Sequence, residues 1–522
     1  MGVTSFAFII FCIITVFVFY MLPYRMRWVW LLAMNLLFYV SAGVLQVVFI
    51  VMAACISWSG SWLITRNYQK EEIYFQNTEG LTKERKKEVK LLNGRKRKGI
   101  LFCVLLLVLG QLAVVKYNGI FLHNGSLFCF FGNSVQGIVV PLGISFYSLF
   151  CIGYCIDVYR GQYTAEKSLL KYFTVVTFFP CISQGPFERY GHLSEQIFAD
   201  KKFDGQQVVF GAELMLWGFF KKMVIADNLS PFVTEVFQPG SGGGYGGLFV
   251  IAAAFCYSIQ IYADFSGYVD IVSGLGRMLG IALVQNFNAP YFSKSVPEFW
   301  RNWHMSLGSW FKDYVFYSVL RSSWCQFLVK KAGKVFSRKV SMNIVTSVAL
   351  FINWFLIGLW HGLEWKYILF DLYYGGIMIL DIWLKPIYRT GNCSAFFYRV
   401  FQVGRTFLVV CFAYILLCAG NVSEFIFHLK EIIFYPNPKR FFSYELFAMG
   451  ISRSKAVMLL FAVAVLVLVD ILHVKGHNIR CEVAKKNIVL RWLLLVGIIY
   501  AVILFGAYGP EYDVSTFIYQ AF

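Results

Sequence analysis

Two stretches within residues 285–376 decide how the rest of the chain is interpreted: Glu298-Phe-Trp-Arg-Asn-Trp-His-Met-Ser-Leu-Gly308 and Gly358-Leu-Trp-His-Gly-Leu-Glu-Trp365. Each places one histidine, His304 or His361, among aromatic residues. Hydrophobic segments lie on either side, and they are long enough to cross a bilayer, since a helix needs about 20 apolar residues for roughly 30 Å of hydrocarbon. Two histidines at membrane depth point to acid–base chemistry inside the membrane.

The composition supports the same class of protein. Of 522 residues, 58% are hydrophobic and only 14% are charged, whereas soluble domains carry about a quarter charged residues. We expect an all-α polytopic membrane protein with roughly ten to twelve transmembrane helices plus re-entrant or interfacial helices. The chain is expected to form a single integral-membrane domain, residues 1–522, with its catalytic core at about 139–384.

The apolar runs give the expected positions of the spans. Residues Tyr172–Ile182 are too short to cross and read as a re-entrant or interfacial segment. Two glycine-containing outer loops are expected, at Asn118–Gln136 and at Gly240–Gly247, and the G-x-G-x-x-G pattern in the second follows no strand and indicates no dinucleotide site. The expected spans are Ser5–Leu22, two helices within Arg27–Ile64 that break at Ser41-Ala-Gly43, Ile100–Val115, Val139–Ile156, Val208–Ile225, Leu248–Tyr262, Ile344–Trp360, Trp365–Leu384, Phe401–Ala419, Ala456–Leu472 and Ile488–Phe505.

Positive charge is concentrated in one segment. The formal charge is +19, and much of it lies in residues 65–99. Lys and Arg are retained on the cytoplasmic side of membranes, so we expect a cytoplasmic basic loop there, placed to meet anionic lipid headgroups. Nucleic-acid binding is the remote alternative, and we expect no nucleic-acid partner.

Residues 286–342 are basic and aromatic and contain no run able to span a membrane. Ser295-Val-Pro-Glu298 has the pattern of a capping box and predicts the start of a helix. This amphipathic segment is expected on the cytoplasmic side, in the interface or dipping inward. Its broad helical face would carry Trp300, Trp303, His304, Leu307, Trp310, Phe311 and Tyr314.

The candidate chemistry centres on the two histidines. His361, flanked by Trp360 and Trp365, could act as a general base in an enclosed, partly dry site; the alternative is a histidine that binds a carbonyl of a neighbouring helix. His304 is either a packed histidine or a second acid–base or orienting group. Asp264, within helical reach of Tyr268, could pair with an intramembrane Lys or Arg as a structural contact. No metal-ligand set, phosphate-binding loop or Gly-x-Ser-x-Gly motif is present in the sequence.

A family resemblance emerges from several motifs taken together. Gln285-Asn-Phe-Asn-Ala-Pro-Tyr-Phe292, the two histidine stretches and Trp360-His-Gly362 resemble the core of the membrane-bound O-acyltransferase (MBOAT) family, in its bacterial branch of alginate and other polysaccharide O-acetyltransferases. The supporting motifs are Pro141-Leu-Gly-Ile-Ser-Phe-Tyr147, Asp157-Val-Tyr-Arg-Gly161, Phe178-Phe-Pro180, Gln184-Gly-Pro186, Asp264-Phe-Ser-Gly-Tyr268 and the ending Phe517-Ile-Tyr-Gln-Ala-Phe522.

The resemblance implies a function and a set of site residues. It implies that His361 is the essential histidine and His304 the second, and that an acyl group, as acetyl, passes from a cytoplasmic thioester to a hydroxyl of a cell-surface polymer. The donor would be acetyl-CoA or an acyl carrier protein, with no bound cofactor and no metal. The implied setting is the bacterial cytoplasmic membrane, among membrane lipids, with an extracytoplasmic partner resembling SGNH hydrolases. Candidate residues of the donor tunnel are Trp303, Asn302, Trp360, Trp365, Asp264 and Tyr268.

Two departures leave the acceptor open. The branch usually has a histidine where this chain has Tyr374, and Phe-Arg-Ala where it has Leu417-Cys-Ala419. The alternatives are D-alanyl transfer to teichoic acid and O-acylation of a lipid. A different class of protein, a proton-coupled transporter, would use His304 and His361 as a proton relay.

Overall fold

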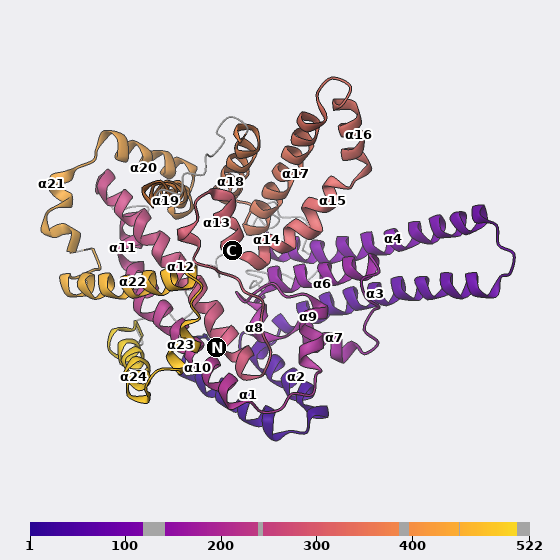
Figure 1. Cartoon of the computed structure of the whole chain (residues 1–522), viewed down its shortest axis with the longest axis horizontal. Coiled ribbons are helices and arrows are strands. Elements are labelled where there is room, and N and C mark those ends of the chain that lie inside the picture. The colour runs from indigo at the N-terminus through magenta and orange to yellow at the C-terminus, as the bar shows by residue number, and fades with distance from the viewer. Residues whose placement is uncertain (118–140, 238–243, 386–395, 448, 509–522) are drawn as a thin grey trace, which may run out of the picture. The chain divides into compact units, whose positions relative to one another are not determined.

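The computed structural model describes most of the chain, and every regular element in the described part is a helix, which confirms the all-α prediction (Figure 1). The expected outer loop Asn118–Gln136 and half of the expected loop Gly240–Gly247 lie outside the described residues. The described residues are 1–117, 141–237, 244–385, 396–447 and 449–508. They separate into two compact units, one of residues 1–209 with 275–283 and the other of 210–274 with 284–522. The single-domain assignment remains a prediction.

The first unit is built around a long helical hairpin. Helices α3 and α4 run side by side well beyond the length needed to cross a membrane (Figure 1). The helices of this unit are α1 (Phe6–Met21), α2 (Tyr24–Val40), α3 (Gln46–Asn77), α4 (Lys83–Lys116), α6 (Ile144–Tyr159), α7 (Leu169–Val176), α8 (Phe179–Ile182) and α9 (Tyr190–Ile197). The predicted break at Ser41-Ala-Gly43 is confirmed, because α2 ends at Val40 and α3 begins at Gln46.

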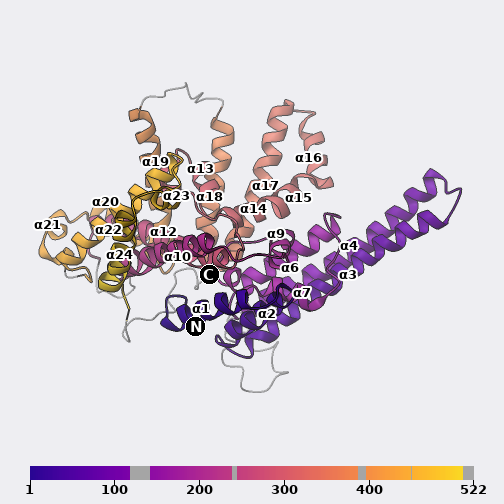
Figure 2. The same ribbon diagram turned by 60° about the horizontal axis from the view of Figure 1, so that its bottom comes forward.

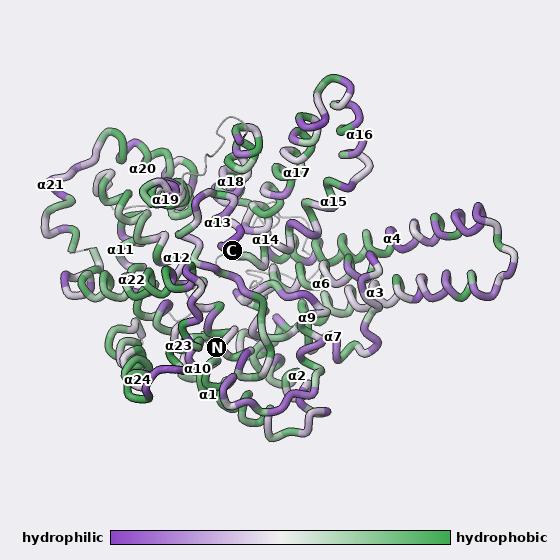
Figure 3. The backbone as a smooth tube through the Cα atoms, viewed as in Figure 1, coloured by the Kyte–Doolittle hydropathy of each residue, from purple (hydrophilic) through white to green (hydrophobic). Residues whose placement is uncertain are grey.

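The basic segment 65–99 is helical rather than a loop, except for residues 78–82. Lys, Arg and Glu are good helix formers, and the Thr82 side chain caps α4 by accepting a hydrogen bond from the amide of Arg85. A buried ion pair holds the two helices together, with 3.1 Å between the Arg97 guanidinium and the Glu71 carboxylate. Hydrophilic residues concentrate in the part of the hairpin away from α6 (Figure 3). The position of the charge was therefore predicted correctly, but the loop predicted for this segment was wrong.

The short segment at residues 172–182 folds as two short helices, α7 and α8, and does not form one span. Buried Asn35 on α2 ties their junction together. Its amide group donates to the Thr174 carbonyl at 3.1 Å, and its oxygen accepts from the Phe179 amide at 3.2 Å. Backbone groups left open by the break are thereby satisfied from a neighbouring helix, as an interrupted helix inside a membrane protein requires.

The second unit holds both signature histidines. Helices α17 and α18 form a helical hairpin (Figure 2). The helices here are α10 (Gly205–Phe219), η2 (Phe220–Ala226), α11 (Asp227–Phe237), α12 (Gly247–Met278), η3 (Pro290–Phe292), α13 (Val296–Asn302), α14 (Met305–Phe311), η4 (Lys312–Phe316), α15 (Tyr317–Leu320), α16 (Ser323–Ala332), α17 (Arg338–His361), α18 (Trp365–Leu384), α19 (Phe396–Cys418), α20 (Val422–Phe434), α21 (Pro438–Phe441), η5 (Tyr444–Phe447), α22 (Arg453–Val474), α23 (Ile479–Ala484) and α24 (Ile488–Phe505).

Eight of the described helices are long and apolar enough to cross a membrane: α3, α4, α12, α17, α18, α19, α22 and α24. Two shorter apolar helices, α1 and α6, bring the described candidates to the lower end of the expected ten to twelve crossings. The expected span at Val208–Ile225 is divided between α10 and the π-helix η2. The chain is a multi-pass helical membrane protein.

The helix predicted to run through the first histidine stretch is interrupted. Its start is confirmed, since the Ser295 side chain accepts from the amide of Glu298. However, α13 ends at Asn302 and α14 begins at Met305, and His304 between them has a left-handed backbone with φ 47° and ψ 48°. The segment that includes Asn286 causes the break, because its backbone carbonyl accepts from the Met305 amide at 2.9 Å. The prediction of one continuous amphipathic helix was therefore wrong.

Candidate active site

His361 lies at the corner of the α17–α18 hairpin. It is the last residue of α17, and only residues 362–364 separate it from α18. The turn is closely packed, because a Cβ on Gly362 would lie 2.5 Å from the ring of Tyr367, and a Cβ on Gly358 would lie 2.9 Å from the Cα of Ile368. Glycine at both positions lets the hairpin close tightly and holds the histidine at its corner.

A carboxylate from the other arm of the hairpin binds His361. The Nδ1 atom of His361 is 2.7 Å from Oδ2 of Asp371, which is fully buried on α18. A carboxylate accepts hydrogen bonds, so this contact keeps the proton on Nδ1 and gives Nε2 the basic lone pair. It also stabilises the imidazolium that forms when Nε2 takes up a proton. The pair has the arrangement of a general base with its orienting carboxylate.

His304 is held by a different kind of partner. The side-chain oxygen of Asn286 accepts hydrogen bonds from the amide of Ser306 at 3.2 Å and from its hydroxyl at 2.7 Å. The backbone amide can only donate, so this contact fixes which end of the Asn286 side chain is the oxygen. Nδ1 of His304 lies 3.1 Å from the same oxygen and must carry the proton. Nε2 of His304 is therefore also an acceptor, backed by a neutral amide rather than a carboxylate.

His304 lies outside the candidate spans and is 2% exposed. Burial, and secondarily the charge of His361, lower the pKa of His304 well below its usual value. The ring is thus neutral at physiological pH. The elements that carry the two histidines pack together, since the ring centre of Trp300 on α13 is 4.9 Å from that of Tyr374 on α18. Phe265 on α12 meets the His304 ring edge-on, with 4.7 Å between the ring centres.

Aromatic side chains enclose the two histidines. Trp303 is 2% exposed and packs against the rings of Phe287 and Phe299, with centre-to-centre distances of 5.1 Å and 5.6 Å. Trp360 is buried, and its ring centre is 5.0 Å from that of His361. Trp303 and Trp360 are thus buried, whereas the enclosed site expected between Trp360 and Trp365 stays a prediction.

Three predicted tunnel residues lie in different environments. Asn302 is half-buried, and its side chain donates to the Ser293 hydroxyl at 3.1 Å. Tyr268 is buried on α12, whereas Trp365, at the start of α18, is 68% exposed. The structure thus brings Trp303 and Trp360 to the histidine pair and leaves Trp365 on the surface. Tyr374, at the position where a histidine is usual in the resembled branch, is fully buried, with its ring centre 4.9 Å from that of Trp300.

Asp264 belongs to a buried ionic network. Its carboxylate is 2.6 Å from Nζ of Lys222, and the same Nζ is 2.8 Å from the carboxylate of Asp227. On the preceding residue, the Lys221 ammonium is 2.8 Å from Asp270. The prediction that Asp264 pairs with a cation is confirmed. Both lysines lie on η2, and the wider turn of a π-helix is a frequent feature of functional regions. The network anchors η2 to α12, one residue before Phe265.

Replacing Lys222 by methionine should strongly destabilise the protein. Two carboxylates, Asp227 and Asp264, would stay buried after their common cation is lost, and removing one partner of a buried ion pair costs about 3–5 kcal/mol. We expect the melting temperature of the purified protein in detergent to fall clearly. The exposed Lys475→Met variant is the control, and equal melting of the two variants would contradict a structural role for the network.

Two residues of the candidate site were missed by the sequence analysis. Asp371 had a usable signal, since a carboxylate within the apolar run Trp365–Leu384 is costly at membrane depth and marks a functional position. Asn286 had no such signal in the sequence beyond its place in the motif Gln285–Phe292. Its role depends on contacts with Ser306 and His304, and spacing along the chain does not reveal such contacts.

Comparison with known proteins links this geometry to a chemistry. The chain is 33% identical over 289 residues to a probable alginate O-acetylase of Pseudomonas syringae pv. tomato, a match that covers 55% of this chain and 50% of the relative. It is 36% identical over 250 residues to that of Azotobacter vinelandii, with 47% and 45% covered. A teichoic acid D-alanyltransferase of Streptococcus thermophilus is 29% identical over 258 residues, with 48% and 60% covered.

These matches cover only part of each protein, which limits the properties that can be inferred for this chain. The chain spans about half the length of the curated alginate O-acetylases it matches. A comparison with protein-family models found no match. The similarity to several named transferases nevertheless confirms the family resemblance. The chain is a homologue of the alginate O-acetylases and teichoic acid D-alanyltransferases, which are proteins of the MBOAT type.

Proposed function

We propose that this protein transfers an acyl group, acetyl in the first instance, from a thioester to hydroxyl groups of a cell-surface polysaccharide. The observation that carries the proposal is the buried pair of His361 and Asp371, with 2.7 Å between Nδ1 and Oδ2. A hydroxyl is a weak nucleophile until a base takes its proton, and a histidine backed by a carboxylate supplies that base. The names of the relatives support the choice of an acyl group and of a polysaccharide acceptor.

The proposed step balances without a bound cofactor. The acceptor oxygen attacks the thioester carbonyl carbon, and its proton passes to Nε2 of His361. A carbon–oxygen bond forms and the carbonyl becomes a tetrahedral oxyanion. The oxyanion collapses, the carbon–sulfur bond breaks, and the thiolate leaves with the proton held by His361. The thioester supplies the driving force, so no nucleotide is consumed.

His304 is suited to a different task in the same step. In its neutral form Nε2 is an acceptor, so it cannot donate to an oxyanion, and the one hydrogen of the attacking hydroxyl passes to His361. Its amide partner, Asn286, does not stabilise a positive charge as Asp371 does for His361. We therefore assign proton removal to His361 and, to His304, a hydrogen bond from a second hydroxyl of the acceptor. Oxyanion stabilisation falls to a donor other than neutral His304.

The same proposal includes a donor, an acceptor and a partner protein. The donor is acetyl-CoA or a thioester on an acyl carrier protein on the cytoplasmic side. The acceptor is outside, so the chain would act in the bacterial cytoplasmic membrane. An extracytoplasmic partner resembling SGNH hydrolases would complete transfer to the polymer. In that case the attacking hydroxyl at His361 belongs to the partner's serine or to the polymer itself.

D-alanyl transfer to teichoic acid is the second candidate. The similarity to the Streptococcus thermophilus D-alanyltransferase favours it, and the match covers 60% of that relative. The reaction class is the same, because an acyl group again moves from a thioester to a hydroxyl. Only the acyl group and the polymer differ.

Esters on purified cell-surface polymers would test the proposed function. Mild alkali releases the esterified groups from polymers of wild-type cells and of cells lacking this protein, and mass spectrometry identifies them. We expect acetate in the wild type and its loss in the deletion strain. Loss of D-alanine instead would support the second candidate. An unchanged ester content in every polymer would contradict both and turn attention to lipid acylation or proton-coupled transport.

A further inference from the structure

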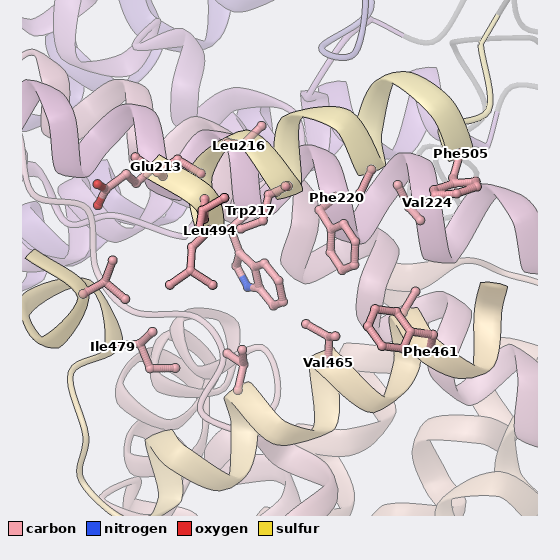
Figure 4. A pocket seen from close by; sticks show the side chains of 18 of the residues that line it. Glu213, Leu216, Trp217, Phe220, Val224, Phe461, Val465, Ile479, Leu494 and Phe505 are labelled. Carbon is pink, nitrogen blue, oxygen red and sulfur yellow. The ribbon is translucent and has the colours of Figure 1, made fainter. Parts of the chain in front are cut away.

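A large cavity opens in the second unit, formed by helices that the proposed reaction does not use. Its volume is about 860 Å³, within the range of roughly 300–1,000 Å³ usual for ligand pockets. Helices α10, η2, α22 and α24 line it (Figure 4). Neither His304 nor His361 is among the lining residues.

The cavity is apolar along most of its length and charged at one end. Trp217 and Val465 lie in its middle, and Phe461 and Phe505 lie at one end (Figure 4). Glu213 and Ile479 lie on the opposite side of the view (Figure 4), and Arg480, which follows Ile479 in the sequence, is also among the lining residues. This distribution matches an amphiphile, with a hydrocarbon chain along the aromatic and aliphatic walls and a polar group at the charged end.

The surrounding charge determines the sign of that polar group. Glu213 already has a cationic neighbour, since its carboxylate is 3.9 Å from the guanidinium of Arg491. Arg480 remains as a cation of the lining, and its Nε is buried without a hydrogen-bond partner among the described residues. A buried donor left unpaired is costly, and a phosphate oxygen would satisfy it through a charge-assisted hydrogen bond. Residues 475–486 add Lys475, Lys485 and Lys486 to the same connection between α22 and α24.

Helix α24 contacts η2, and its Phe505 carbonyl accepts from the Asn228 side chain at 2.9 Å, but little of the helix is covered by protein. The helix is apolar enough to span a membrane, yet none of its residues is buried. It forms one wall of the cavity while α22 forms another (Figure 4). An empty apolar cavity of this size would forfeit the dispersion contacts of its walls. Hydrocarbon chains are the apolar material available at membrane depth.

We propose that the cavity between α10, η2, α22 and α24 binds one anionic membrane phospholipid. Its acyl chains lie along Trp217, Val465 and Phe461, and its phosphate binds Arg480. The bound lipid adds to the direct contact that α24 makes with η2. This site is separate from the acyl-transfer site, so the inference does not depend on the proposed function.

Native mass spectrometry of the purified full-length protein would test the site. The probes are phosphatidylglycerol, which is anionic, and phosphatidylcholine, which has no net charge, with matched acyl chains. We expect the protein to retain one phosphatidylglycerol in preference to phosphatidylcholine. Val465→Trp fills the cavity and should abolish this retention, whereas Val467→Trp, on the exposed side of the same helix, should not. Equal retention in the two variants would overturn the proposal.

The headgroup contact has its own test. Arg480→Gln should weaken the preference for phosphatidylglycerol about fivefold, as expected for ~1 kcal/mol per basic residue. The exposed Lys486→Gln variant removes an equal charge outside the cavity and should have a smaller effect. If Val465→Trp does not fold, Leu494→Trp fills the cavity from α24. An unchanged preference in Arg480→Gln, or a polypeptide found in place of the lipid, would overturn the assignment.

Discussion

Replacing His361 by alanine should lower acyl transfer by a factor of about 10²–10⁴, the usual contribution of a general base. In cells, the ester content of the polymer should fall to that of the deletion strain. The loss is expected because the remaining histidine, His304, is backed only by the neutral amide of Asn286, which does not stabilise the positive charge that a base acquires. Labelled acetyl transfer in membrane vesicles measures the rate over this range.

Two further variants separate chemistry from folding. His361→Gln keeps a hydrogen-bond donor for the buried Asp371 carboxylate but provides no base, and it should be as inactive as the alanine variant. His477→Ala removes an exposed histidine that also contacts a carboxylate, that of Glu482 at 2.6 Å, and should leave the rate unchanged. Transfer at the wild-type rate by either His361 variant, with the protein present in the membrane, would remove His361 from the mechanism.

Asp371→Asn should be almost as damaging, with a loss of the same order, about 10²–10⁴-fold. An amide nitrogen facing Nδ1 donates a hydrogen bond and favours the ring tautomer whose Nε2 carries the proton, which cannot act as a base. Asp371 is a positioning residue, so we expect kcat to fall while KM for the thioester stays unchanged. Steady-state kinetics in vesicles distinguishes the two constants.

The control for Asp371 is another change of carboxylate to amide on the same hairpin. Glu364→Gln removes an exposed carboxylate that pairs with Lys366 at 3.2 Å and should have little effect. A rise in KM at constant kcat in Asp371→Asn would show that the carboxylate shapes the binding site rather than orienting the base.

The sequence was sufficient for the helices whose apolar residues form continuous runs. The hairpin around His361 was predicted within a few residues, because two apolar runs flank a glycine, and α22 and α24 were predicted for the same reason. The break at His304 was not, since the aromatic residues from Trp300 to Tyr314 continue the helical period across it. A distant segment at Asn286 stops the helix, and periodicity carries no information about such a partner.

The candidate site was predictable to the same extent. The histidines stand out as ionisable residues in apolar surroundings, and Asp264 was expected to find a cation. Which residues bind them, Asp371 for His361 and Lys222 for Asp264, depends on how the helices are arranged in space. The basic segment 65–99 shows the converse case, because its charge was interpreted as a loop, whereas the helix propensity of Lys, Arg and Glu and the Thr82 cap both favour a helix.

The left-handed backbone of His304 restricts how this site can evolve. A left-handed conformation costs most residues roughly 1–2 kcal/mol, whereas glycine adopts it freely and asparagine or aspartate visit it more readily. At position 304, with φ 47°, the backbone conformation therefore limits which residues are tolerated, independently of any effect on the reaction. A lineage that replaced this histidine would have few residues to choose from. A wider choice would require the segment around Asn286 to change with it.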